Sequence, residues 1–194
     1  MTKDRLSYPL SLVHRDAPDF LFRVYDPIQE KDVEIGIEKI ESVPQNEAEK
    51  EFLREKFGGP EVYYITHHKP VEVRKCSKEL KQEIKDNCPG PGWEGDEAAT
   101  EWADAMLYSV KKKMVIFEKK CFKKFEKNWL LIYDNWSLPP FDSEREAELL
   151  LPKIKELSCF DKFDIVFIIT GNKICEYSST GFVQLENNDL WAEN

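Results

Sequence analysis

The chain has 194 residues, of which 34% are charged and 41% are hydrophobic. A chain of this length and composition is expected to fold as one domain, residues 1–194, with a substantial core and a very polar surface. Acidic residues outnumber basic ones by 37 to 28, and the resulting net charge of −9 excludes a uniformly basic protein that coats nucleic acid.

The sequence also lacks the patterns of a membrane span, a signal peptide and a structural zinc site. No apolar run approaches the ~20 residues of a membrane span, and residues 1–8 have no apolar core of the signal-peptide kind. The five cysteines are scattered and form no Cys-x-x-Cys pair, so no zinc site is expected. We therefore expect a cytoplasmic protein with free, reduced thiols and no contact with a membrane.

Two alternating runs near the N-terminus predict a β-hairpin, which follows a short strand at residues 10–14. Residues 20–24 and 33–38 alternate apolar and polar side chains on either side of a Pro- and Asp-containing loop. Such a hairpin brings Asp19 close to Glu38, and two converging carboxylates are costly unless a cation such as Mg²⁺ or Mn²⁺ neutralises them. The alternative is that both are ordinary solvated acids at strand ends.

The next stretch predicts a helix at residues 47–57, ended by two glycines and a proline, and then a β-rich strand at residues 62–66. His67 and His68 end this strand. Adjacent side chains on a strand point to opposite faces, so this pair is not expected to chelate one ion. A short helix at residues 77–85 and a loop without a phosphate-binding pattern follow.

The longest predicted helix runs from Asp96 to Glu126. Its apolar residues recur every three or four positions, which predicts a stripe facing a core: Trp102, Met106, Val110, Met114, Phe117, Cys121 and Phe125. Lys113 falls at the border of this stripe and is placed to look toward the sheet. The alternative is that its long side chain reaches outward into solvent.

Lysines crowd the second half of the same predicted helix. Residues 111–127 contain eight lysines and two glutamates, a local net charge of +6. Such a face is usually solvated surface, but on an acidic protein it also indicates contact with a polyanion. We assign nucleic-acid contacts to Lys111, Lys112, Lys120 and Lys124.

The C-terminal part adds buried strands and one more helix. The run from Asn128 to Tyr133 is typical of a central strand covered on both faces. The other expected elements are a helix at 143–157, a strand at 163–169 and its hairpin partner at 173–177, followed by a polar tail. The fold class expected from this order is α/β (α+β), a mixed central sheet flanked by helices.

Five segments, in this order, carry a resemblance to a known family: Pro18-Asp19-Phe20, Ile35-Gly36-Ile37-Glu38, Val110-x-x-Lys113, Trp129-Leu130-Leu131-Ile132 and Phe163-Asp164-Ile165-Val166-Phe167-Ile168. The chain resembles the PD-(D/E)XK nuclease superfamily, which has the restriction-endonuclease-like fold. The resemblance implies that Asp19 and Glu38 bind Mg²⁺ or Mn²⁺, that a lysine completes the site, and that the activity is hydrolysis of a nucleic-acid phosphodiester.

The chain departs from the family pattern at one position. The pattern places a lysine two residues after the second acid, where this chain has Ile40, and Lys39 is expected to point to the opposite face of the strand. Some members supply the lysine from the following helix, which implies Lys113 here. The alternative function is a catalytically inactive protein of this fold that binds a protein partner in an accessory or regulatory role. The sequence leaves DNA and RNA equally open as substrates.

Overall fold

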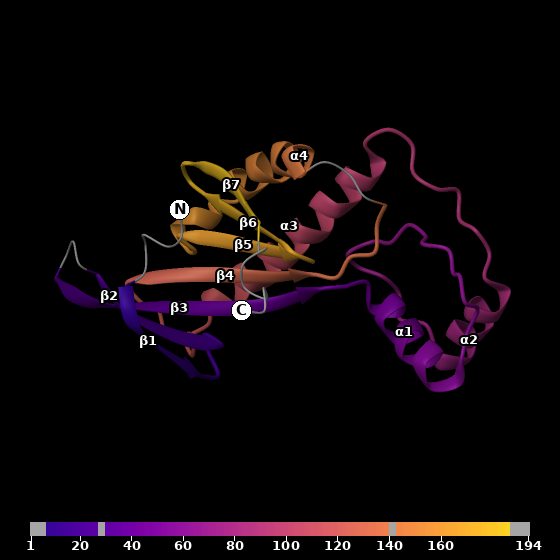
Figure 1. Ribbon diagram of the computed structural model, residues 1–194, viewed down its shortest axis with the longest axis horizontal. Helices are drawn as coiled ribbons and strands as arrows, with labels where there is room; N and C mark the ends of the chain where they lie inside the picture. The colour runs from indigo at the N-terminus through magenta and orange to yellow at the C-terminus, as the bar shows by residue number, and fades with distance from the viewer. Residues whose placement is uncertain (1–6, 27–29, 140–142, 187–194) are drawn as a thin grey trace, which may run out of the picture.

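The structure is a computed structural model, and it describes residues 7–26, 30–139 and 143–186. It is a mixed α/β fold, as the order of the predicted elements indicated: one seven-stranded sheet with helices packed against it (Figure 1). The strands are β1 (Ser7–His14), β2 (Phe20–Asp26), β3 (Lys31–Ser42), β4 (Lys127–Asp134), β5 (Ile165–Thr170), β6 (Lys173–Ser178) and β7 (Gly181–Glu186). The helices are α1 (Gln45–Phe57), α2 (Ser77–Asp86), α3 (Glu97–Phe117) and α4 (Ser143–Glu156), with a short 3₁₀ turn at Cys159–Asp161.

The strands follow the same order in the sheet as in the chain. β3, β4 and β5 run parallel to one another, and all other neighbours are antiparallel. The predicted N-terminal hairpin is confirmed, because β2 pairs antiparallel with β3 from Phe20–Ile37 to Asp26–Lys31. β7 was not predicted; it pairs with β6 and extends the sheet at its C-terminal edge.

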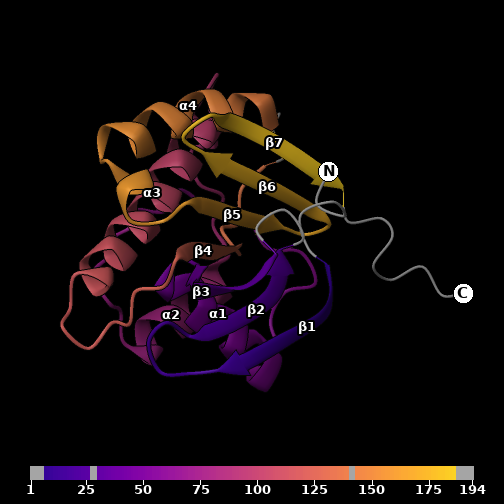
Figure 2. The same cartoon turned by 90° about the vertical axis from the view of Figure 1, so that its left-hand side faces the viewer.

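The main core lies between one face of the sheet and the two helices α3 and α4, which stand together on that side (Figure 2). Trp102, Met106 and Val110 of α3 meet Leu130 and Ile132 of β4 and are almost fully buried. On β4 only alternate residues are fully buried; Trp129 and Leu131 are half-buried and Tyr133 is exposed. The predicted central position of this strand is therefore confirmed, whereas its second face is covered only in part.

Helix α3 ends at Phe117, nine residues before the predicted end at Glu126. On a continuous helix Phe122 would lie about 140° around the axis from Phe117 and would point away from the core. The chain instead turns after α3, and the Phe122 ring packs 4.9 Å from that of Phe117, which also contacts Phe163. Lys120, Cys121, Lys124 and Phe125 consequently lie in the loop before β4 and not on the helix.

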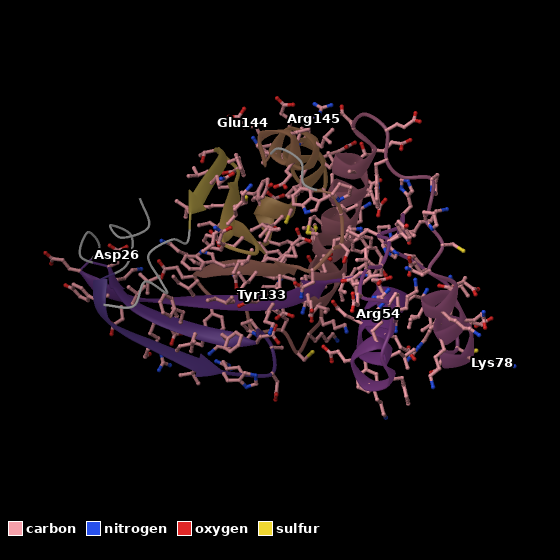
Figure 3. All side chains as sticks on the ribbon, turned by 45° about the vertical axis from the view of Figure 1, so that its right-hand side comes forward. Asp26, Arg54, Lys78, Tyr133, Glu144 and Arg145 are labelled. Atoms are coloured by element: carbon pink, nitrogen blue, oxygen red, sulfur yellow. The ribbon has the colours of Figure 1, made fainter. Side chains whose placement is uncertain are left out.

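Between β3 and α3 the chain forms an extension, residues 43–96, which we call the arm. Figure 1 shows α1 and α2 beyond one end of the sheet, and Figure 3 marks them with Arg54 and Lys78. The arm has a small core of its own, made by Leu53, Leu80 and Ile84. Because this core is small, most of the arm's other apolar side chains remain at its surface.

The strand predicted at residues 62–66 does not form. Its backbone contacts the side chain of Asn87, which donates to the Val62 carbonyl at 2.9 Å and accepts weakly from the Tyr64 N–H at 3.4 Å. The residues have high β-propensity, but a strand requires a neighbouring strand, and none lies beside this segment in the described chain. None of the described helices is long and apolar enough to cross a membrane.

Candidate functional site

The end of the β2–β3 hairpin fixes the position of Asp19. The last paired residues are Phe20 and Ile37, so the backbone of Lys39 lies just beyond the end of β2. Its N–H donates to Oδ2 of Asp19 at 2.6 Å, which replaces the missing strand partner. The carboxylate of Asp19 is thereby held against β3 next to Glu38.

Glu38 lies on the face of β3 that is covered by α3. Its side chain is 5% exposed, and that of Lys113 on α3 is 12% exposed. The ammonium nitrogen of Lys113 donates to Glu38 Oε1 at 2.6 Å and lies 3.8 Å from Asp19 Oδ2. The three residues proposed from the sequence therefore converge, and Lys113 points inward rather than into solvent.

The donor atoms at this point suit a hard divalent cation. Oε2 of Glu38 is buried and has no hydrogen-bond partner among the described residues, which is costly for a carboxylate oxygen. Mg²⁺ commonly uses one or two protein carboxylates and completes its shell with water and substrate phosphate. No cluster of three or more His, Cys, Asp or Glu side chains suited to a metal occurs in the described part of the chain. Asp19 and Glu38 offer two carboxylates, and they are the residues that would hold an ion at this point.

Gly36 allows two loops to approach the site closely. A β-carbon at this position would lie 2.9 Å from Cγ of Pro18 and 2.7 Å from Cδ2 of Phe125, both closer than side chains tolerate. Pro18 directly precedes Asp19, and Phe125 belongs to the loop between α3 and β4. The absence of a side chain at Gly36 therefore sets where the Asp19 turn rests on the sheet.

The two residues after Glu38, Lys39 and Ile40, point to opposite faces of the sheet, as the alternation of a strand predicts. Lys39 is exposed on the other face of the sheet, with its ammonium nitrogen 5.2 Å from the ring centre of Tyr133. Ile40 packs against the main core. Neither residue supplies a charge at Glu38, so Lys113 is the lysine that does.

Basic side chains border the Asp19 turn through the loop after α3. The N–H of Lys123 donates to the carbonyl of Ala17 at 3.4 Å, two residues before Asp19. The side chains of Lys123 and Arg15 both lie over the ring of Phe125. The sequence interpretation did not assign a role to either residue. The position of Lys123 depends on the unpredicted turn after α3, whereas Arg15 is a near neighbour of Asp19 in the chain and donates its N–H to the Asp19 carbonyl at 2.7 Å.

The four lysines assigned to nucleic-acid contact are all exposed, but on two different segments. Lys111 and Lys112 lie on the last turns of α3, and Lys120 and Lys124 lie in the following loop. The acids of this region pair with lysines from elsewhere: Glu118 with Lys162, and Glu126 with Lys31. None of the four assigned lysines forms an ion pair with a described residue. Their charge is therefore available to an external anion.

His67 and His68 lie in a loop of the arm and not at a strand end. His67 Nδ1 lies 2.9 Å from Oε2 of Glu101, and the N–H of His68 donates to Oε1 at 2.8 Å. The indole N–H groups of Trp93 and Trp136 donate to the same carboxylate, each at 3.0 Å. Glu101, which the sequence did not single out, is thus a four-contact acceptor that attaches the arm to α3.

Two buried thiols are poorly suited to nucleophilic chemistry. Burial raises the pKa of both Cys159 and Cys175 to about 12, so they remain protonated at neutral pH.

The chain was compared with protein-family models, with curated proteins and with solved structures, and none of them matches it.

Proposed function

We propose that the chain is a metal-dependent phosphodiesterase of the PD-(D/E)XK type that acts on nucleic acid. The observation that supports this most is the convergence of Asp19, Glu38 and Lys113 from three separate elements at one largely buried point. Two carboxylates and one lysine make up the set of groups that the resemblance implies. The free thiols suit the reducing cytoplasm in which we expect the protein to work.

Each residue has a role that follows from its position. Asp19 and Glu38 would hold a Mg²⁺ or Mn²⁺ ion, which when bound polarises a phosphodiester oxygen and lowers the pKa of coordinated water. The ammonium group of Lys113 lies beside both carboxylates, where it can stabilise negative charge that develops on the phosphate. The N–H of Lys39 keeps the Asp19 carboxylate oriented through its hydrogen bond.

Exposed cations on α3 and the next loop, together with Lys123 and Arg15, would contact the nucleic-acid backbone. Lys123 and Arg15 adjoin the Asp19 turn, while Lys111, Lys112, Lys120 and Lys124 are exposed along the end of α3 and the next loop. Phosphate contacts of this kind position a strand without reading its sequence. We therefore expect binding that depends strongly on salt and weakly on base sequence.

Calorimetric titration with Mn²⁺ tests the metal site directly. We expect the protein to bind the ion and Glu38→Gln to lose that binding, with circular dichroism confirming that both are folded. Glu34→Gln is the matched control, because Glu34 is on the same strand and forms only an exposed pair with Arg23. Absence of Mn²⁺ binding by the wild-type protein at millimolar concentration contradicts the proposal.

Cleavage is then measured on labelled DNA and RNA, in single- and double-stranded form. Product that forms with Mg²⁺ and disappears in Glu38→Gln supports the nuclease function. The second candidate is an inactive protein of this fold that binds a partner, and the apolar surface of the arm favours it. Metal binding without any cleavage of these four substrates would favour that second function.

A further inference from the structure

The arm exposes more large apolar side chains than it buries. Its core has three apolar residues, whereas the arm carries eight exposed ones: Phe52, Phe57, Val62, Tyr63, Tyr64, Ile65, Val71 and Val73. Two of these, Val62 and Val73, are 73% and 88% exposed. Apolar side chains exposed this densely on one projecting segment indicate an interaction surface.

A groove lies between the end of α1 and α2, and Phe57 is the exposed residue of this set that lines it. We call it the arm groove. It has a volume of about 440 Å³, and its apolar lining comes from Leu53, Phe57, Pro60 and Ile84. Gly58, with φ 79° and ψ 162°, ends α1 and turns the chain toward Pro60. The end of α1 and the two glycines that follow it thus form one wall of the groove.

The edge of the arm groove is basic. Lys81 and Lys85 of α2 line it, and Lys81 Nζ lies 3.8 Å from the ring centre of Phe57. Lys56 approaches the same ring at 5.4 Å. None of these lysines forms an ion pair with a described side chain, so they carry uncompensated charge next to an apolar floor.

The acids of α2 are engaged away from this edge. Glu79 accepts the N–H of Cys76, Glu83 pairs with Lys75 and Lys50, and Asp86 accepts from Gln82. The helix thus presents its lysines to the groove while its carboxylates have partners within the arm. This separation of charge selects for a ligand that is both acidic and apolar.

We propose that the arm groove binds an acidic segment of a partner protein that inserts a bulky apolar side chain between Phe57 and Ile84. The carboxylates of the segment pair with Lys81 and Lys85. The inference does not depend on the metal site, because the groove belongs to the arm and shares no residue with Asp19, Glu38 or Lys113.

A protein segment fits this surface better than a nucleic acid does. Residues 43–96 contain 11 acidic and 9 basic side chains, so outside the lysines of the groove edge the arm offers no excess of positive charge to an extended polyanion. Two of the exposed rings already have a cation over one face: Lys81 lies over Phe57, and Arg54 lies 4.1 Å from the ring centre of Tyr63. The exposed valines and isoleucine offer aliphatic contact instead of stacking.

The test measures fluorescence anisotropy of a labelled peptide, Glu-Glu-Leu-Trp-Glu-Glu, added to the full chain. We expect binding that weakens as salt rises, and a lysine-for-glutamate version of the peptide that binds at least about tenfold more weakly. Phe57→Ser, and separately Lys81→Glu with Lys85→Glu, should each reduce affinity about tenfold. Lys155→Glu on α4 is the control, since that exposed lysine is remote from the groove.

Three results would overturn the proposal. The first is equal affinity for both peptides, or no response to the groove variants. The second is binding of a single-stranded oligonucleotide to the arm that the same variants abolish, which would make the surface a nucleic-acid site. The third is a dimer in sedimentation velocity that Phe57→Ser dissociates, which would make the occupant a second copy of the chain.

Discussion

The ammonium group of Lys113 lies 2.6 Å from Glu38, although the two residues are 75 positions apart in the chain. The pair leaves the second oxygen of Glu38 without a hydrogen-bond partner in the described structure. Glu38 is thus a buried carboxylate that depends on one lysine for its compensation. The free energy of unfolding should therefore respond to changes at this pair, and it can be measured without a substrate.

Replacing Lys113 should destabilise the protein and make its stability sensitive to metal. Lys113→Met leaves Glu38 buried and unpaired, so we expect the free energy of unfolding in urea to fall by about 3–5 kcal/mol without metal. Mn²⁺ should then restore more stability to this variant than to the wild type, because the ion replaces the missing positive charge. The double variant with Glu38→Gln should recover stability without metal and should not respond to Mn²⁺. Equal Mn²⁺ responses in wild type and Lys113→Met would contradict a metal site at Glu38.

A methyl group at Gly36 should lower both the stability of the protein and its affinity for Mn²⁺. The new β-carbon of Gly36→Ala would clash with Pro18 and Phe125, so we expect a loss of about 1–3 kcal/mol in unfolding free energy. Mn²⁺ affinity should fall as well, because displacement of Pro18 moves Asp19. Gly90→Ala, whose β-carbon has looser contacts with Thr66, is the control. A crystal structure of Gly36→Ala with an unmoved Asp19 turn would refute the role given to this glycine.

The attachment of the arm should weaken as pH rises. The hydrogen bond from His67 to the Gly92 carbonyl raises the pKa of His67 above its ordinary 6.5, and the Glu101 carboxylate adds to the effect. A raised pKa means that the stabilisation is complete below pH 6.5 and is lost as pH rises through the folded-state value. Hydrogen exchange, corrected for its intrinsic pH dependence, should show arm protection falling over this range. His67→Gln should remove the trend, whereas His14→Gln on β1 should keep it.

Asp134 provides a pH effect within the main core. Burial raises the pKa of this carboxyl group, which accepts hydrogen bonds from Trp102, Thr170 and the backbone of Trp136. The folded state therefore binds the proton more readily than the unfolded chain, and this contribution to stability falls as pH rises above about 3.8.

Asp134→Asn should consequently cost most at low pH. The amide of asparagine replaces one acceptor oxygen with a donor. We therefore expect the free energy of unfolding to fall by about 1–3 kcal/mol, and this loss should become smaller toward neutral pH. Urea unfolding at several pH values measures this difference, with Asp104→Asn, an exposed partner of Lys153, as the control. A loss that grows with pH would show that the carboxylate is favoured by its surroundings.

Local periodicity was sufficient for most of the sheet and for the acidic pair. Alternation in β2 and β3 indicated a hairpin that brings Asp19 near Glu38, and a one-residue slip in its register would turn the apolar residues to the other face. Lys113 was located in the same way, from its angle on a regular helix. These relationships lie within single elements or between neighbours, where spacing determines geometry.

The errors arose where tertiary packing overrode the local pattern. The stripe continued through Cys121 and Phe125, yet burial of Phe122 against Phe117 required the chain to turn. Residues 62–66 had β-propensity without a strand to pair with. The contacts of Glu101 with two histidines and two tryptophans join four distant segments, and no spacing in the sequence indicates them.

The order of the strands has a consequence for how the molecule folds. Each strand neighbours the next one in the chain, so most of the pairings are short-range and can form early. Two pairings are longer in range: β4 with β5 closes the segment between Asp134 and Ile165, and β3 with β4 must close the whole segment between Ser42 and Lys127. Asp19 and Glu38 belong to the early hairpin, whereas Lys113 lies inside that long closure. The two acids should therefore meet before their lysine arrives, and a metal ion present during refolding should favour the early hairpin by relieving their repulsion.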